Sequence, residues 1–126
     1  MKKFLLLALL ALPLGACATL QTDWAIITGT QVSPTQILVA ANAFDAGEAT
    51  ATQYLLYCKA TVPAPSYCAL ATRQAVVKAV RAGRVARAQL EPYITSGTAG
   101  PSAIYNTLVA TVQSLQTQIP ATGASK

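Results

Sequence analysis

The side chains that could do chemistry are few in this sequence of 126 residues. It has three cysteines, Cys17, Cys58 and Cys68, four carboxylates and no histidine. Since histidine is the commonest general base and a frequent metal ligand, its absence argues against acid–base catalysis and against most metal sites. Three cysteines cannot all pair with one another within one chain, so at least one of them needs a different role.

The neighbouring carboxylates Asp45 and Glu48 are three residues apart in a segment predicted to be helical. This spacing could place an acid and a base, or two cation ligands, on one helix face. The alternative is a solvated patch, or partners for the arginines of residues 73–87. We prefer this alternative because the sequence has no P-loop, no G-x-G-x-x-G, no G-x-S-x-G and no zinc-ligand spacing. We therefore expect no enzyme activity, no metal and no cofactor.

The first sixteen residues, MKKFLLLALLALPLGA, have the layout of a secretory signal peptide. Lys2 and Lys3 form a positive end, an apolar run follows over 4–12, and Pro13 and small residues come next. The apolar run is too short for a spanning helix, which needs roughly 20 apolar residues. A buried N-terminal helix would need polar residues between the leucines, and there are none. We expect residues 1–16 to be removed.

The segment Leu14-Gly15-Ala16-Cys17 resembles the lipobox of bacterial lipoproteins, in which an aliphatic residue and two small residues precede a cysteine. The resemblance implies that the Cys17 sulfur receives a diacylglyceryl group, that the signal is cut just before it, and that the new amine is acylated, for example with palmitate. Cleavage after Ala18 by an ordinary signal peptidase is the alternative, because Ala16 and Ala18 satisfy the small-x-small rule.

The same resemblance implies a location. In Gram-negative bacteria, lipoproteins with aspartate after the cysteine tend to stay in the inner membrane, and here Ala18 follows Cys17. The family rule therefore implies a lipid anchor in the periplasmic leaflet of the outer membrane. Three acyl chains exceed the two signals that stable anchoring requires.

If lipid occupies Cys17, then Cys58 and Cys68 remain, ten positions apart. In an oxidising compartment two such cysteines are most simply interpreted as a disulfide. A redox-active pair is the alternative, but it would normally show C-x-x-C spacing near a βαβ pattern, and neither is present.

The rest of the chain predicts an all-α domain, a small three-helix bundle over 33–119. The sequence SPTQ at Ser33 supplies an N-cap, a proline at the first helical position and a capping box, and this helix runs to about residue 59. A second helix is predicted from about residue 66 to about residue 91, ahead of Pro92, and a third over 101–119. Residues 17–32 are predicted to be the lipidated N-terminus and tether, and 120–126 a disordered tail.

Apolar and small residues recur on one face of each helix. The first face has Ile37, Ala40, Phe44, Gly47, Ala51, Leu55 and Cys58; the second has Cys68, Thr72, Ala75, Ala79, Ala82, Gly83, Ala86 and Leu90; the third has Ile104, Leu108, Val112, Leu115 and Ile119. If the first two helices are antiparallel with the cysteines facing, Phe44 meets Ala82 and Gly83, and Gly47 meets Ala79. Large residues then face small ones along a disulfide-linked hairpin.

A basic stripe is the feature that most suggests binding. It consists of Arg73, Lys78, Arg81, Arg84 and Arg87, with Val76, Val77, Val80 and Val85 among or beside them. The stripe could meet lipid headgroups, lipopolysaccharide phosphates, peptidoglycan carboxylates or an acidic protein. The alternative is a solvated face, with Asp45, Glu48 and Glu91 offsetting some of the charge. Valines that the third helix left uncovered would make a docking surface.

Composition is consistent with a small non-catalytic domain. Without Lys2 and Lys3 the chain keeps seven basic and four acidic residues, an excess of only three, and aromatic residues are few. Together with export, this argues against nucleic-acid binding. We therefore expect an envelope lipoprotein with a structural or interaction role. The alternatives are a phage- or mobile-element-encoded lipoprotein for lysis or exclusion, and a small enzyme completed by a partner's catalytic residues.

Overall fold

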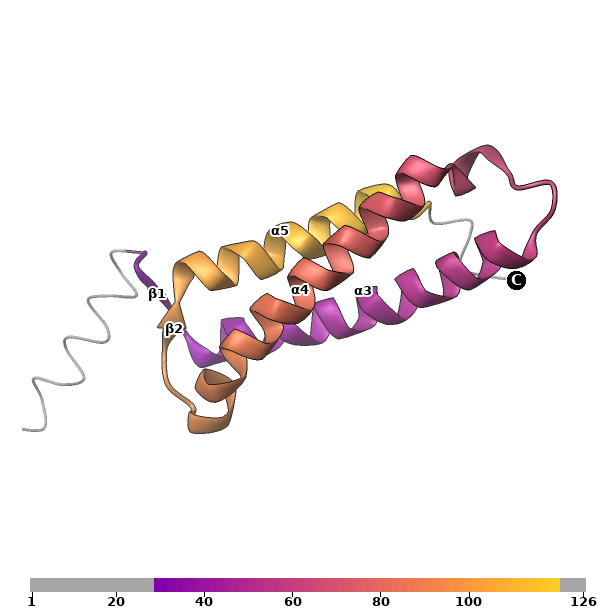
Figure 1. Ribbon diagram of the computed structural model, residues 1–126. Helices are drawn as coiled ribbons and strands as arrows, with labels where there is room; N and C mark the ends of the chain where they lie inside the picture. The colour runs from indigo at the N-terminus through magenta and orange to yellow at the C-terminus, as the bar shows by residue number, and fades with distance from the viewer. Residues whose placement is uncertain (1–28, 121–126) are drawn as a thin grey trace, which may run out of the picture.

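The computed structural model describes residues 29–120 and consists of three long helices with two very short strands (Figure 1). The elements in order are β1 (Gln31–Val32), α3 (Pro34–Ala60), the 3-10 turn η1 (Ser66–Cys68), α4 (Leu70–Ser96), β2 (Gly100–Pro101) and α5 (Ser102–Gln118). Each helix packs against the other two, so the predicted all-α three-helix bundle is confirmed. The expected signal peptide, the lipidation residue Cys17 and residues 121–126 of the tail lie outside the described residues.

The start of α3 is held by the predicted capping box. The Gln36 backbone N–H donates to the Ser33 hydroxyl at 3.3 Å, and the Gln36 side-chain oxygen accepts from the Ser33 backbone N–H at 3.2 Å. Pro34 occupies the first turn, where its missing N–H costs nothing. The helix ends at Ala60, ahead of Pro63.

The predicted bounds of the second helix were wrong at both ends. Residues 66–68 form the separate turn η1, and α4 begins only at Leu70. It also continues through Pro92 to Ser96. Beyond the proline, Tyr93 and Ile94 pack against the core, and their burial offsets the hydrogen bond that proline removes.

The true end of α4 is a glycine cap. Gly97 has φ +65°, its N–H donates to the Ile94 carbonyl at 3.3 Å, and the Thr98 N–H donates to the Tyr93 carbonyl at 3.1 Å. This pair of bonds is the Schellman motif, which satisfies the last carbonyls of a helix.

The tether that we predicted over 17–32 ends in a strand. Its last two residues, Gln31 and Val32, pair antiparallel with Pro101 and Gly100, and the Ser102 N–H donates to the Thr30 carbonyl at 3.1 Å. Gly100 is buried, and a Cβ there would lie 2.7 Å from Ile37 Cδ1. A residue without a side chain therefore allows the strand pair to lie on the start of α3.

The core contains most of the predicted face of α3. Its buried residues are Ile37, Ala40, Ala41, Phe44, Ala51, Tyr54 and Cys58. Two predicted members differ. Leu55 is only half-buried. Gly47 lies against Leu115 of α5 rather than against Ala79, and a Cβ built on Gly47 would be 3.4 Å from Leu115 Cδ1. Tyr54 and Ala41 were not predicted. The buried face is wider than one helix contact requires because α4 and α5 both pack on α3.

The core side of α4 also differs from the prediction. Gly83, Ala86 and Leu90 are buried as expected, and so is Val76, one of the valines whose exposure was left to depend on the third helix. Ala75, Ala79 and Ala82 line a surface groove with α5 instead of packing on α3. Of the other valines of the basic stripe, Val77 and Val80 are half-buried and Val85 is 59% exposed.

The Phe44 ring of α3 packs directly on Gly83 of α4, as predicted. A Cβ built on Gly83 would overlap the Phe44 ring, which is fully buried. Glycine is a poor helix residue, less favourable than alanine by about 1 kcal/mol in an exposed position. Its use at position 83 is explained by the space that the ring needs.

Replacing Gly83 with alanine should therefore lower the free energy of unfolding, by about 1–3 kcal/mol, because the methyl group displaces a packed ring. Gly47→Ala is the matched control: its Cβ meets the tip of a leucine at 3.4 Å, so the gain in helix propensity should leave stability unchanged or raised. Chemical denaturation of both variants measures this. Equal effects would contradict the assigned contact.

The disulfide between Cys58 and Cys68 is present, as predicted, with a Cα–Cα distance of 5.4 Å. Both residues are buried, and the bond connects the last turn of α3 to η1 rather than to α4 itself. Next to it, the rings of Tyr57 and Tyr67 stack with their centroids 6.3 Å apart. The end of the hairpin is thus held covalently as well as by packing.

Replacing both cysteines with serine should lower the free energy of unfolding by about 3 kcal/mol, the value expected for a loop of this length. Thermal unfolding of the oxidised parent, the reduced parent and the double variant measures the effect. The reduced parent and the variant should unfold at similar temperatures. A parent whose stability did not change on reduction would show that the bond does not support the fold.

Candidate anion-binding groove

The five basic residues predicted as one face divide into two groups. Arg84 Nε donates to Glu48 Oε1 at 2.7 Å, which links α4 to α3. Arg87 lies with its Nε 3.5 Å from Asp45 Oδ1 and also pairs with Glu91 one turn along α4. These contacts raise the pKa of the Arg87 guanidinium, chiefly through its hydrogen bond to Glu91. Arg84 and Arg87 are therefore engaged within the bundle.

The same contacts assign Asp45 and Glu48 as partners for arginines. Each carboxylate pairs with a different guanidinium, and the side chains are 52% and 24% exposed. Within residues 29–120, no three histidine, cysteine, aspartate or glutamate side chains come together in a way that could hold a metal ion. Asp45 and Glu48 thus form ion pairs between α3 and α4.

The pairing leaves an imbalance of charge. Asp45, Glu48 and Glu91 are the acidic residues of the described chain, and all three are used by Arg84 and Arg87. The remaining basic residues of the described part form no ion pair with a described carboxylate. They are Lys59, Arg73, Lys78 and Arg81.

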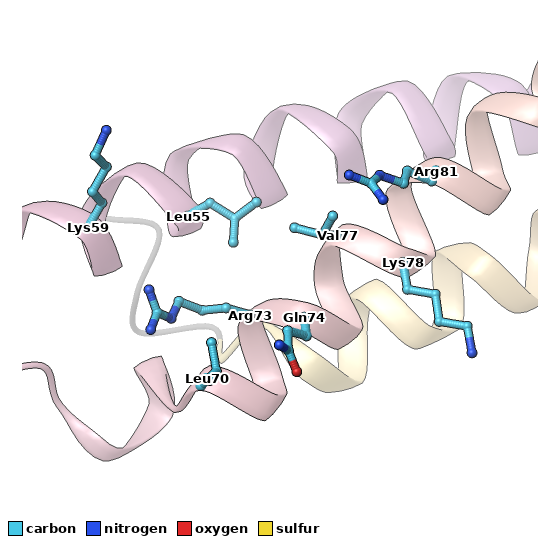
Figure 2. Close-up of a pocket in the computed structure, with 8 residues that line it drawn as sticks. All are labelled: Leu55, Lys59, Leu70, Arg73, Gln74, Val77, Lys78 and Arg81. Atoms are coloured by element: carbon cyan, nitrogen blue, oxygen red, sulfur yellow. The ribbon is translucent and has the colours of Figure 1, made fainter.

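These four basic residues line one groove, together with three apolar side chains and a glutamine (Figure 2). The groove has a volume of about 560 Å³ and lies between α3 and the first half of α4. α3 provides Leu55 and Lys59, and α4 provides the rest. The other lining residues are Leu70, Arg73, Gln74, Val77, Lys78 and Arg81. We call this feature the cationic groove.

Figure 2 shows how the side chains of the cationic groove are arranged. Leu55 and Val77 extend toward each other from the two helices and form an apolar centre. Arg73 extends toward α3 at one end, and the Arg81 guanidinium turns inward at the other. Lys78 points outward from α4. The arrangement is an apolar space with arginine at both ends.

Arg73 occupies an unusual environment for a cation. Its Nε is buried and has no hydrogen-bond partner among the described residues. The Arg87 Nε is buried too, but Asp45 lies beside it. A buried donor without a partner costs free energy that a ligand acceptor would recover. Arg73 is therefore the residue of the groove best prepared to receive an anion.

The N-terminus of α4 adds positive potential at the same end of the groove. Its N-cap is Ala69, which has no side-chain acceptor, and the first turn contains no acidic residue. The first backbone N–H groups of a helix lack partners within the helix and carry partial positive charge. An anion beside Arg73 would lie close to them.

Tyr54, the residue before Leu55 on α3, links that helix to η1 at the disulfide end of the bundle. Tyr54 is fully buried, and its hydroxyl donates to the Tyr67 carbonyl. Burial raises the pKa of the Tyr54 hydroxyl above its ordinary value of 10.0, and the positive charge of Arg73 partly opposes this. The neutral phenol is thus the form that the folded state favours.

The raised pKa of Tyr54 predicts a loss of stability in alkali. Because the folded state holds the phenol proton more tightly than the unfolded chain, the free energy of unfolding should fall as the pH rises above 10.0. Tyr54→Phe should be less stable at neutral pH by about 1 kcal/mol, the usual loss for one hydrogen bond, and its stability should fall less steeply above pH 10.0. Denaturation at neutral and alkaline pH checks this, and parallel pH profiles would contradict it.

Sequence reasoning found three of the four cations in the groove but not the groove. Lys59 was missed because it is on the other helix, and Leu55 was assigned to the core. One signal for the groove was present in the sequence. Leu55 and Lys59 are one helical turn apart and lie on either side of Cys58, which forms the disulfide. A crosslinked hairpin necessarily brings that turn next to the start of the second helix.

Comparison with protein-family models, curated proteins and solved structures gives no match for this chain. In the part of the chain that the structure describes, no helix has both the length and the apolar character that crossing a bilayer requires.

Proposed function

We propose that this chain is a non-catalytic, lipid-anchored protein of the bacterial envelope that acts as an interaction module for an anionic partner. The observation that carries the proposal is the division of charge on the bundle. Every described carboxylate is paired with Arg84 or Arg87, and the four other cations of residues 29–120 line one apolar groove. A solvated face that served only solubility would not require this separation.

The proposed anchor is Cys17, on the strength of the lipobox-like Leu14-Gly15-Ala16-Cys17 and the apolar run before it. The lipid would lie in the periplasmic leaflet of the outer membrane, with Ala18 as the residue after the cysteine. The described chain begins at Gly29, beside the strand pair at the start of α3.

The position of the groove suits such an anchor. Figure 1 shows the strand pair at one end of the bundle and the connection between α3 and α4 at the other. α3 has 27 residues, so at 1.5 Å per residue these ends are about 40 Å apart. The groove lies in the half near the α3–α4 connection. The polypeptide therefore enters the described bundle at the end opposite the groove.

The intact mass of the protein purified from membranes tests the anchor, with Cys17→Ser as the control. We expect a chain that begins at Cys17, heavier by a diacylglyceryl and an acyl group and lighter by two hydrogens for the disulfide. The control should lack the lipid mass. An unmodified chain that begins at Thr19 would contradict anchoring and leave a free exported protein.

A further inference from the structure

We propose that the cationic groove binds a lipid with one acyl chain and an anionic phosphate headgroup. The inference rests on the proposed function in one respect: it names the anionic partner of the basic helix. In the bound state the phosphate lies against Arg73 and the start of α4, and the acyl chain lies between Leu55 and Val77.

The headgroup position follows from the unsatisfied donors at one end of the groove. Among the described residues, Arg73 Nε is buried without a partner, α4 has no side-chain cap, and no acidic side chain lines the groove. A phosphate accepts several hydrogen bonds and suits the planar guanidinium. It also favours the positive end of a helix dipole. Lys59 lies on α3 at the same end, with its amine turned away from Arg73, so it adds positive potential near the headgroup but no contact with it.

The acyl chain position follows from the apolar centre. Leu55 and Val77 face each other across the groove, and Leu70 is 62% exposed beside Arg73. Exposed apolar surface is stabilised when a hydrocarbon chain covers it. At the far end, Arg81 and Lys78 have long methylene stems that can lie along a chain while their charges stay in water.

The size of the groove favours a single-chain lipid over a protein partner. Small-molecule sites have volumes of about 300–1,000 Å³, and the groove, at about 560 Å³, lies in this range. A stable protein interface needs roughly 20–30 residues on each side, whereas the groove is formed by eight. From Leu70 to Arg81 the helix rises about 16 Å, which matches an acyl chain of medium length.

The test is calorimetric titration of the full chain carrying Cys17→Ser, with lauroyl-lysophosphatidylglycerol as the probe below its micelle-forming concentration. Lauroyl-lysophosphatidylcholine has the same acyl chain with a zwitterionic headgroup, and glycerol 3-phosphate has the phosphate without the chain. We expect saturable binding of the anionic lysolipid, binding of the choline lysolipid that is weaker by about tenfold, and no saturable binding of glycerol phosphate.

A matched pair of variants places the site. Arg73→Gln should weaken binding of the anionic lysolipid by about tenfold, because it removes the guanidinium proposed to contact the phosphate. Arg84→Gln removes the same charge from the same helix but outside the groove, and binding should change by less than about twofold. Val77→Asn should weaken binding of both lysolipids. Far-ultraviolet circular dichroism of each variant confirms that the helices are intact.

Equal affinity for the two lysolipids would overturn the proposal, and so would equal losses in Arg73→Gln and Arg84→Gln. The absence of lysolipid binding, together with saturable binding of an acidic amphipathic peptide, would assign the groove to a protein partner instead. These outcomes are separate from the mass of the membrane-purified protein. If Cys17 is lipidated but no lysolipid binds, only the proposed lysolipid site is overturned. If a lysolipid binds but Cys17 is not lipidated, only the proposed anchor is overturned.

Discussion

The contact of Phe44 with Gly83 determines how the rest of the bundle is arranged. The ring lies where a side chain of α4 would otherwise be, so α3 and α4 approach closely at this point. Toward the α3–α4 connection the two helices separate, as Figure 1 shows, and there the disulfide joins α3 to η1 and not to α4. Between the close contact and the covalent bond, Leu55 and Val77 line an open groove. A glycine at one position and a cysteine in a turn thus leave space for a ligand.

The charged residues also differ between the two halves of the bundle. Near the close contact, Glu48 and Asp45 of α3 pair with Arg84 and Arg87 of α4. Ion pairs on a surface contribute little to stability, so their main effect is to neutralise this half of the basic stripe. Farther along, α3 offers Lys59 in place of a carboxylate. The net charge of the chain is modest, but the described cations that form no ion pair are concentrated where the apolar surface is open.

Much of the fold could be predicted from local chemistry. The capping box at Ser33, the pairing of Cys58 with Cys68 and the contact of Phe44 with Gly83 depend on residue type and helical spacing, which the sequence contains directly. The extension of α4 past Pro92 could not be predicted in this way. It depends on Tyr93 and Ile94 reaching the core, which is a property of the assembled bundle.

The candidate site was only partly predictable for the same reason. The helical spacing of Arg73, Lys78, Arg81, Arg84 and Arg87 places them on adjoining faces, but spacing cannot tell which of them meet a carboxylate from α3. The burial of Val76 could not be decided from the sequence, because it depends on which part of α4 the third helix covers, and α5 does pack on α4. The groove arises from the angle between α3 and α4 and from Lys59, which lies on α3 and not on the helix that has the basic stripe. Neither is present in a pattern along a single helix.

The short strand pair has a mechanical consequence for a tethered molecule. The chain reaches α3 through Gln31 and Val32, which are hydrogen-bonded to the connection between α4 and α5, and the Ser102 N–H holds the Thr30 carbonyl. Tension on the N-terminal segment would therefore be transmitted to α4 and α5 as well as to α3. Pulling on one end of the polypeptide would load the bundle as a whole, and the first turn of α3, with its capping box, would be shielded from unwinding.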